Sequence, residues 1–69
     1  MKKLVVLDYS NGMLDIINVS EESSNRCDLL GDSNWLVYDK LGYKESETEY
    51  MIVDDQLVIN QYEENEITN

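Results

Sequence analysis

The stretch "LVVLDYSNGMLDII", residues 4–17, decides the fold of this chain. Asn11-Gly12 stands between two β-rich runs, and both residues tolerate the positive φ of a type I′ hairpin turn. A two-residue loop here predicts that Asp8 lies directly opposite Asp15, where like charges are destabilising. Three explanations stay open for the two carboxylates: a different register, screening by solvent, or a positive group that meets them.

The first strand of this hairpin is apolar on both of its faces. Leu4 and Val6 alternate with Val5 and Leu7, so neither side of the strand is polar. Such a pattern is typical of a central strand in a sheet that is covered on two sides.

A second hairpin is predicted from "YMIVDDQLVI", residues 50–59, because two apolar runs flank a turn at Asp54-Asp55. Residues 20–31, which precede it, are mostly polar and predict a loop with at most a short helical turn.

The segment between the loop and the second hairpin is ambiguous. Trp35-Leu36-Val37-Tyr38 has the composition of a strand. However, Asp32 or Ser33 can cap the start of a helix, and Gly42 is placed to end one in a left-handed conformation. A short helix over residues 33–41 is therefore the favoured prediction.

These elements predict an α+β fold of the order ββαββ, a four-stranded antiparallel sheet of two hairpins with one short helix on one face. Residues 1–62 would form a single small domain, and residues 63–69 an acidic, frayed tail. One short helix covers only one face of a sheet. The other apolar face must then meet Leu29-Leu30, a second copy of the protein or a partner.

The charge of the chain is strongly negative and unevenly spread. The net charge is −10; residues 1–40 carry seven acids and four basic residues, giving −3, and residues 41–69 carry eight acids and one lysine, giving −7. Such a field repels nucleic acids and anionic membranes and attracts basic surfaces. We therefore expect a basic, nucleic-acid-binding protein as the partner, with no direct nucleic-acid or membrane binding.

Catalytic and metal-binding patterns are nearly lacking in the sequence. It has no histidine, no glycine-rich phosphate loop and one cysteine, Cys27, with nothing in the chain to pair with or to activate it. We expect neither an enzyme nor a cofactor nor a metal site. A lone cysteine and no apolar run long enough for a bilayer favour the cytoplasm.

The candidate binding residues are acids of the C-terminal half. Glu45, Glu47 and Glu49 alternate, which would place them on one side of an extended segment. Carboxylates spaced along a strand can occupy a groove built for phosphates. The predicted partner-binding set is Glu45, Glu47, Glu49, Asp54, Asp55, Glu63 and Glu64. The alternative is a small dimeric structural or accessory domain whose acids only confer solubility.

Two further stretches, "LVVLDYSNG" and "LGYKESETEYMIVDD", resemble small uncharacterised proteins carried by phages and mobile elements of Bacteroidales. Those proteins begin with an "LDYS-x-G" hairpin and end in an "LGY…YM-VDD" segment, so the resemblance implies a shared fold and no particular chemistry. In size and charge the chain is also similar to anti-CRISPR inhibitors and other DNA mimics, which implies an inhibitor acting in the cytoplasm of a host bacterium.

Overall fold

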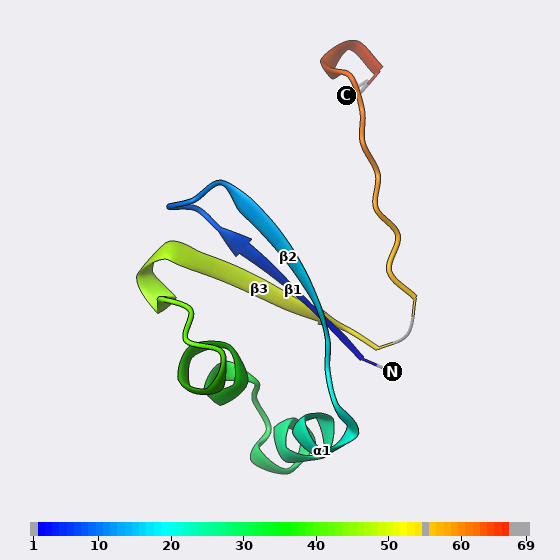
Figure 1. Cartoon of the computed structure of the whole chain (residues 1–69). Coiled ribbons are helices and arrows are strands. Elements are labelled where there is room, and N and C mark those ends of the chain that lie inside the picture. The colour runs from blue at the N-terminus through cyan, green and yellow to red at the C-terminus, as the bar shows by residue number, and fades with distance from the viewer. Residues whose placement is uncertain (1, 55, 67–69) are drawn as a thin grey trace.

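The computed structural model describes residues 2–54 and 56–66 of the chain. A three-stranded antiparallel sheet has β1 (Lys3–Asp8) in the middle, between β2 (Met13–Asn18) and β3 (Thr48–Val53). The helix α1 (Glu21–Leu30) and the π-helix η1 (Trp35–Lys40) lie together on one side of this sheet (Figure 1). Two short 3-10 helices complete the chain: η2 (Glu45–Glu47) precedes β3, and η3 (Glu64–Glu66) follows the extended C-terminal segment.

The predicted four-stranded sheet of two hairpins is wrong. Residues 56–59, which were expected to pair with β3, form no strand. Together with residues 60–63 they lead away from the sheet as an extended segment, here called the arm (Figure 1). An Asp-Asp pair lacks the glycine or asparagine that two-residue hairpin turns prefer. Of this predicted turn, Asp54 is exposed and follows β3, and Asp55 lies outside the described residues.

The first hairpin is present, but its predicted register is wrong. The loop has four residues, Tyr9 to Gly12, so that Asp8 lies opposite Met13, and Asp15 lies opposite Val6. The two carboxylates are therefore not directly opposed. The carboxylate of Asp8 instead organises the loop: it accepts hydrogen bonds from the Ser10 hydroxyl (2.9 Å) and from the side-chain amide of Asn11 (2.9 Å).

This role of Asp8 leads to a prediction about acid. Hydrogen bonds from Asn11 and Ser10 hold the pKa of Asp8 below its ordinary value of 3.8. A carboxyl group with a lowered folded-state pKa stabilises the fold above pH 3.8, and this contribution is lost as the pH falls through the folded-state value. Asp8→Ala should lower the melting temperature at neutral pH, and the difference from the unchanged protein should shrink as the pH falls below 3.8. Circular dichroism melts across this range check it; a constant difference would contradict it.

The helix α1 occupies the segment for which a loop was predicted. The Ser20 side chain caps its start by accepting a hydrogen bond from the Ser23 backbone N–H (3.1 Å). Gly31 ends it in the left-handed conformation, φ 77°, and donates its N–H to the Cys27 carbonyl oxygen (2.9 Å). Only Ser23 and Cys27 of this helix are buried, which explains why no apolar period marks it in the sequence.

The helix predicted over residues 33–41 is present as the π-helix η1. Its wider turns are seen where the Leu41 N–H donates to the Leu36 carbonyl oxygen, five residues back (3.0 Å). Gly42 follows with φ 80°, the left-handed conformation predicted for it.

The core lies between the sheet and the two helices. Leu4 and Val6 of β1 and Val37 of η1 are fully buried there. Val19, Cys27 and Leu36 complete the buried cluster, against which several partly buried side chains pack: Ile17, Trp35, Tyr38, Tyr43, Tyr50 and Ile52. Since both helices cover this face, the opposite face of the sheet is left open.

Candidate functional site

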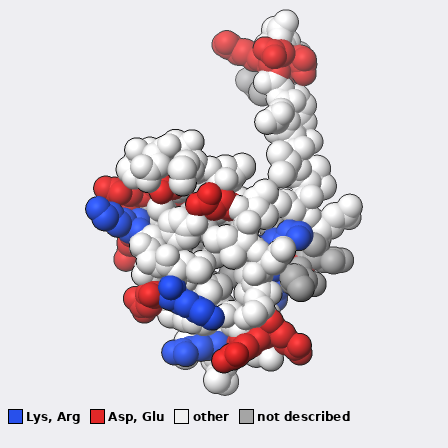
Figure 2. Space-filling view, in the orientation of Figure 1, with Lys and Arg blue, Asp and Glu red and all other residues white. Residues whose placement is uncertain are grey.

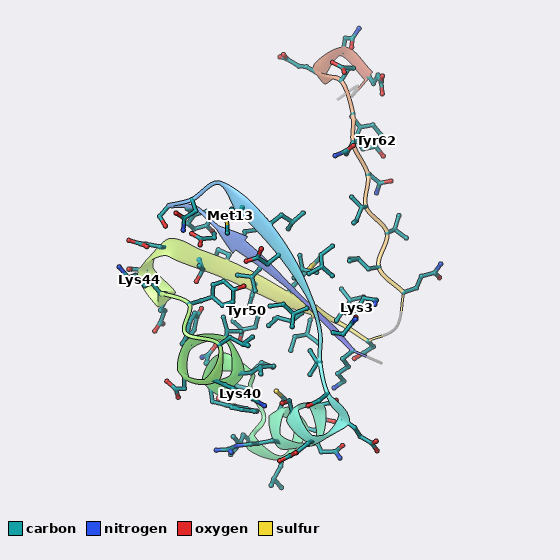
Figure 3. All side chains as sticks on the ribbon, in the orientation of Figure 1. Lys3, Met13, Lys40, Lys44, Tyr50 and Tyr62 are labelled. Carbon is teal, nitrogen blue, oxygen red and sulfur yellow. The ribbon has the colours of Figure 1, made fainter. Side chains whose placement is uncertain are left out.

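Acidic side chains gather at the end of the sheet that holds the hairpin loop. Asp8 ends β1 there and pairs with Thr48, the first residue of β3. The Tyr9 backbone N–H donates to the Glu47 carbonyl oxygen (2.8 Å), which ties η2 to the same place. We call this region the acidic end; it comprises Asp8, Asp15, Glu45, Glu47 and Glu49. Its nearest basic residue in sequence is Lys44, which is labelled in Figure 3.

The structure brings together only part of the predicted binding set. Glu45, Glu47 and Glu49 belong to the acidic end, although η2 is a 3-10 helix and so removes the alternation expected for an extended segment. Asp54 lies beyond the other end of β3, 3.9 Å from the Lys2 ammonium.

The remaining predicted residues lie elsewhere. Glu63 and Glu64 are exposed at the far end of the arm, where Figure 2 shows an acidic group well apart from the body of the protein. Asp55 is outside the described residues. The acids of the C-terminal half therefore do not form one continuous surface.

Two residues of the acidic end, Asp8 and Asp15, are not in the predicted set. The sequence did contain a signal for them, since the hairpin brings any acid of β1 close to an acid of β2. The half-buried Asp15 accepts a hydrogen bond from the Tyr43 hydroxyl (2.7 Å). Burial, and then this bond to Asp15, raise the pKa of Tyr43 to about 12. Tyr43 therefore stays neutral, and Asp15 keeps its donor, through the physiological range.

Tyr9 connects the acidic end to the open side of the sheet. Its pKa is raised by desolvation and, next, by the negative charge of Glu49. Glu49 itself is exposed on β3, at the corner where the acidic end meets the open face of the sheet.

Internal ion pairs neutralise little of the negative charge. Among the described residues, Lys2 alone forms them, with Asp28 (2.8 Å) and Asp54 (3.9 Å). Of the fourteen acids described, twelve are thus in no ion pair. Arg26 and Lys40 instead lie over the ring of Trp35, 4.6 and 5.9 Å from its centroid, where they join α1 to η1.

The face of the sheet turned away from the helices is apolar. We call it the open face; its apolar residues are Val5, Leu7, Leu14, Ile16 and Met51. Leu14 and Met51 are about half exposed, at 51% and 53%. With Leu57, Val58 and Ile59 of the arm, these side chains line a groove of about 320 Å³. A continuous apolar surface of this kind marks an interaction site in a small protein.

Within residues 2–54 and 56–66, no three acidic or cysteine side chains come close enough to hold a metal ion. Cys27 is a free thiol buried in the core. In the part of the chain that is described, no helix has both the length and the apolar character that a bilayer crossing requires. The surface features that the described residues present are the carboxylates of the acidic end and the apolar side chains of the open face.

Comparisons with known proteins found no relative of this chain. The sequence matches no protein-family model, and neither a curated protein nor a solved structure matches this chain.

Proposed function

We propose that this chain is a non-enzymatic acidic binding protein, an inhibitor made by a phage or mobile element that occupies the basic surface of a host nucleic-acid-binding protein. The observation that carries the proposal is the acidic end. Five carboxylates lie there with Lys44 beside them, on a chain whose ion pairs leave twelve described acids unpaired. An inhibitor of this kind acts in the cytoplasm of the host bacterium.

The physical basis of the binding is electrostatic complementarity. A surface that binds phosphates is lined with lysine and arginine and is covered by counterions, which an acidic protein can replace. Complementary charge raises the association rate most strongly and makes it depend on salt. The residues expected to contribute most are Glu45 and Glu47, which are the acids of η2 and take part in no ion pair within the described chain.

The test compares two double variants with the same change of charge. Glu45→Gln with Glu47→Gln alters the acidic end, and Glu21→Gln with Glu22→Gln alters the first turn of α1. Basic proteins captured from a bacterial lysate at low salt would be identified, purified and measured by surface plasmon resonance. We expect the first variant to slow association roughly tenfold and the second to slow it much less.

Two results would contradict the proposal. One is that no basic protein is captured at low or high salt. The other is that both double variants weaken binding equally, because the acidic end would then have no particular role beyond net charge.

A second function, that of a small dimeric accessory domain, is supported by the open face. On this alternative the acids keep a protein with a large apolar surface soluble. On this alternative neither double variant should change the association rate with a partner. The same measurements therefore separate the two functions.

A further inference from the structure

We infer that the open face is an interface between two copies of this chain, stacked face to face with their β1 strands antiparallel and with Lys3 of each copy paired with Glu49 of the other. This inference rests on the open face and deepens the second function proposed above, that of a dimeric accessory domain. It does not depend on the proposed inhibitor, since the acidic end lies outside the stacked faces except at Glu49.

The chain's own helices cannot cover the open face. Leu29 and Leu30, the apolar pair that might have reached it, lie on α1, which packs on the opposite side of the sheet (Figure 1). Leu29 is 85% exposed and contacts no part of the core cluster. The open face and α1 are thus separate apolar surfaces.

The apolar area is close to what a stable dimer needs. Four side chains of the open face are 43% to 53% exposed: Leu7, Leu14, Ile16 and Met51. Val58 and Ile59 of the arm extend the same groove and are still more exposed. Together these side chains leave roughly 500 Å² of apolar surface per copy, against roughly 800 Å² per partner in an interface of standard size. Their polar neighbours would supply the rest.

Charge also favours a second copy at this face. Two molecules that each carry −10 repel one another, so they can associate only where acids are few. Among the residues that β1, β2 and β3 place on the open face, Glu49 is the one acid and Lys3 the one base. Neither is in an ion pair within the described chain, although the Lys3 ammonium donates to the Asn18 side-chain oxygen (2.8 Å).

The positions of these two charges select the orientation of the copies. Lys3 begins β1, whereas Glu49 pairs with Leu7, four residues along β1, so the charges lie roughly 13 Å apart along the strand direction. Figure 3 labels Lys3 at the end of the sheet away from Lys44, which precedes η2 and β3.

The two copies are related by a two-fold axis that lies in the plane midway between the two sheets and is perpendicular to the strands. Rotation about this axis reverses the direction of the strands. Lys3 of one copy then faces Glu49 of the other, on the neighbouring strand, across the distance of roughly 10 Å that separates packed sheets. The two side chains together span this distance, and the symmetry makes the pair twice.

Sedimentation equilibrium and light scattering test the interface. The unchanged protein should reach twice the 8.0 kDa mass of one chain as its concentration rises through the micromolar range. Ile16→Glu and, as a second variant of the same face, Met51→Glu should remain monomeric while keeping the circular dichroism spectrum of the fold. Leu29→Glu is the matched control, because it adds the same charge to an exposed leucine of α1, and it should still dimerise.

Charge reversal tests the orientation. Lys3→Glu and Glu49→Lys should each weaken the dimer roughly tenfold, and the double variant, with the two charges exchanged, should restore the original affinity at low salt. A protein that stays monomeric at high micromolar concentration would overturn the inference, whatever other partner covers the face. A dimer that survives Ile16→Glu, or one in which the double variant is as weak as the singles combined, would overturn it too.

Discussion

Replacement of Leu4 by Ala is expected to remove most of the stability of the protein. Leu4 is fully buried near the start of β1, on the face of the sheet that the helices cover. Removal of a buried leucine side chain costs about 3 kcal/mol, through lost burial and the cavity that remains. A core of this size supplies about 3–5 kcal/mol in all, so little stability would be left.

Urea unfolding followed by the fluorescence of Trp35, which packs against the core cluster, measures this effect. Leu29→Ala is the control: it removes the same atoms from a side chain that is 85% exposed and should change the free energy of unfolding by less than about 0.5 kcal/mol. If both variants unfold at the same urea concentration as the unchanged protein, the core has been placed wrongly.

The second large effect is expected for Tyr43→Phe. The change removes the hydroxyl that donates to Asp15 and leaves a half-buried carboxylate without this partner. A lost hydrogen bond to a charged group costs about 1–2 kcal/mol after allowance for the solvent that can replace it. The change should also alter the response to alkali.

The direction of the alkaline effect follows from the raised pKa. Tyr43 has a folded-state pKa of about 12 against an ordinary value of 10.0, so its hydrogen bond contributes fully below pH 10 and is lost as the pH rises toward 12. The stability difference between the unchanged protein and Tyr43→Phe should therefore shrink over this range. Thermal melts at several pH values measure it, with Tyr62→Phe, an exposed tyrosine of the arm, as the control. A difference that does not depend on pH would be evidence against the bond between Tyr43 and Asp15.

The sequence predicts the features of this fold that depend on residues close together in the chain, namely turns, helix ends and the apolar pattern of a strand. Asn11-Gly12 marks the position of the hairpin, and Gly42 marks the end of the second helix with the backbone conformation that glycine permits. The two-sided apolar pattern of residues 4–7 identifies β1 as the central strand, which is its place in the sheet. The hairpin register could not be predicted in the same way, because it depends on the bonds that the Asp8 carboxylate makes across the loop.

Other parts depend on distant contacts that leave no local pattern. The helix α1 buries only Ser23 and Cys27, so its main signals in the sequence are its capping residues, Ser20 and Gly31, which the prediction of a loop did not take into account. The apolar run at residues 57–59 has strand composition, but β3 pairs with β1, forty residues or more away along the chain, and not with this run. Propensity alone cannot decide between a near partner and a distant one.

Only part of the acidic end was predicted, because the rest of it also depends on distant contacts. Glu45, Glu47 and Glu49 are close in sequence, so their proximity in space follows from the chain itself. Asp8 and Asp15 come close to each other through the hairpin of β1 and β2, which the sequence predicts. They join the three glutamates through the pairing of β1 with β3, which the sequence does not specify. Glu63 and Glu64 share only their charge with the acidic end, and charge alone says nothing about position.

The central place of β1 has a consequence for the kinetics of folding. Its pairing with β2 closes a four-residue loop and can form within microseconds, whereas its pairing with β3 joins Asp8 to Thr48 and must close a loop of about forty residues. The strand β1 therefore pairs early with β2 on one edge and late with β3 on the other. Until β3 has paired with β1, that edge has unpaired backbone groups, and it is during this interval that chains at high concentration would form wrong contacts with one another.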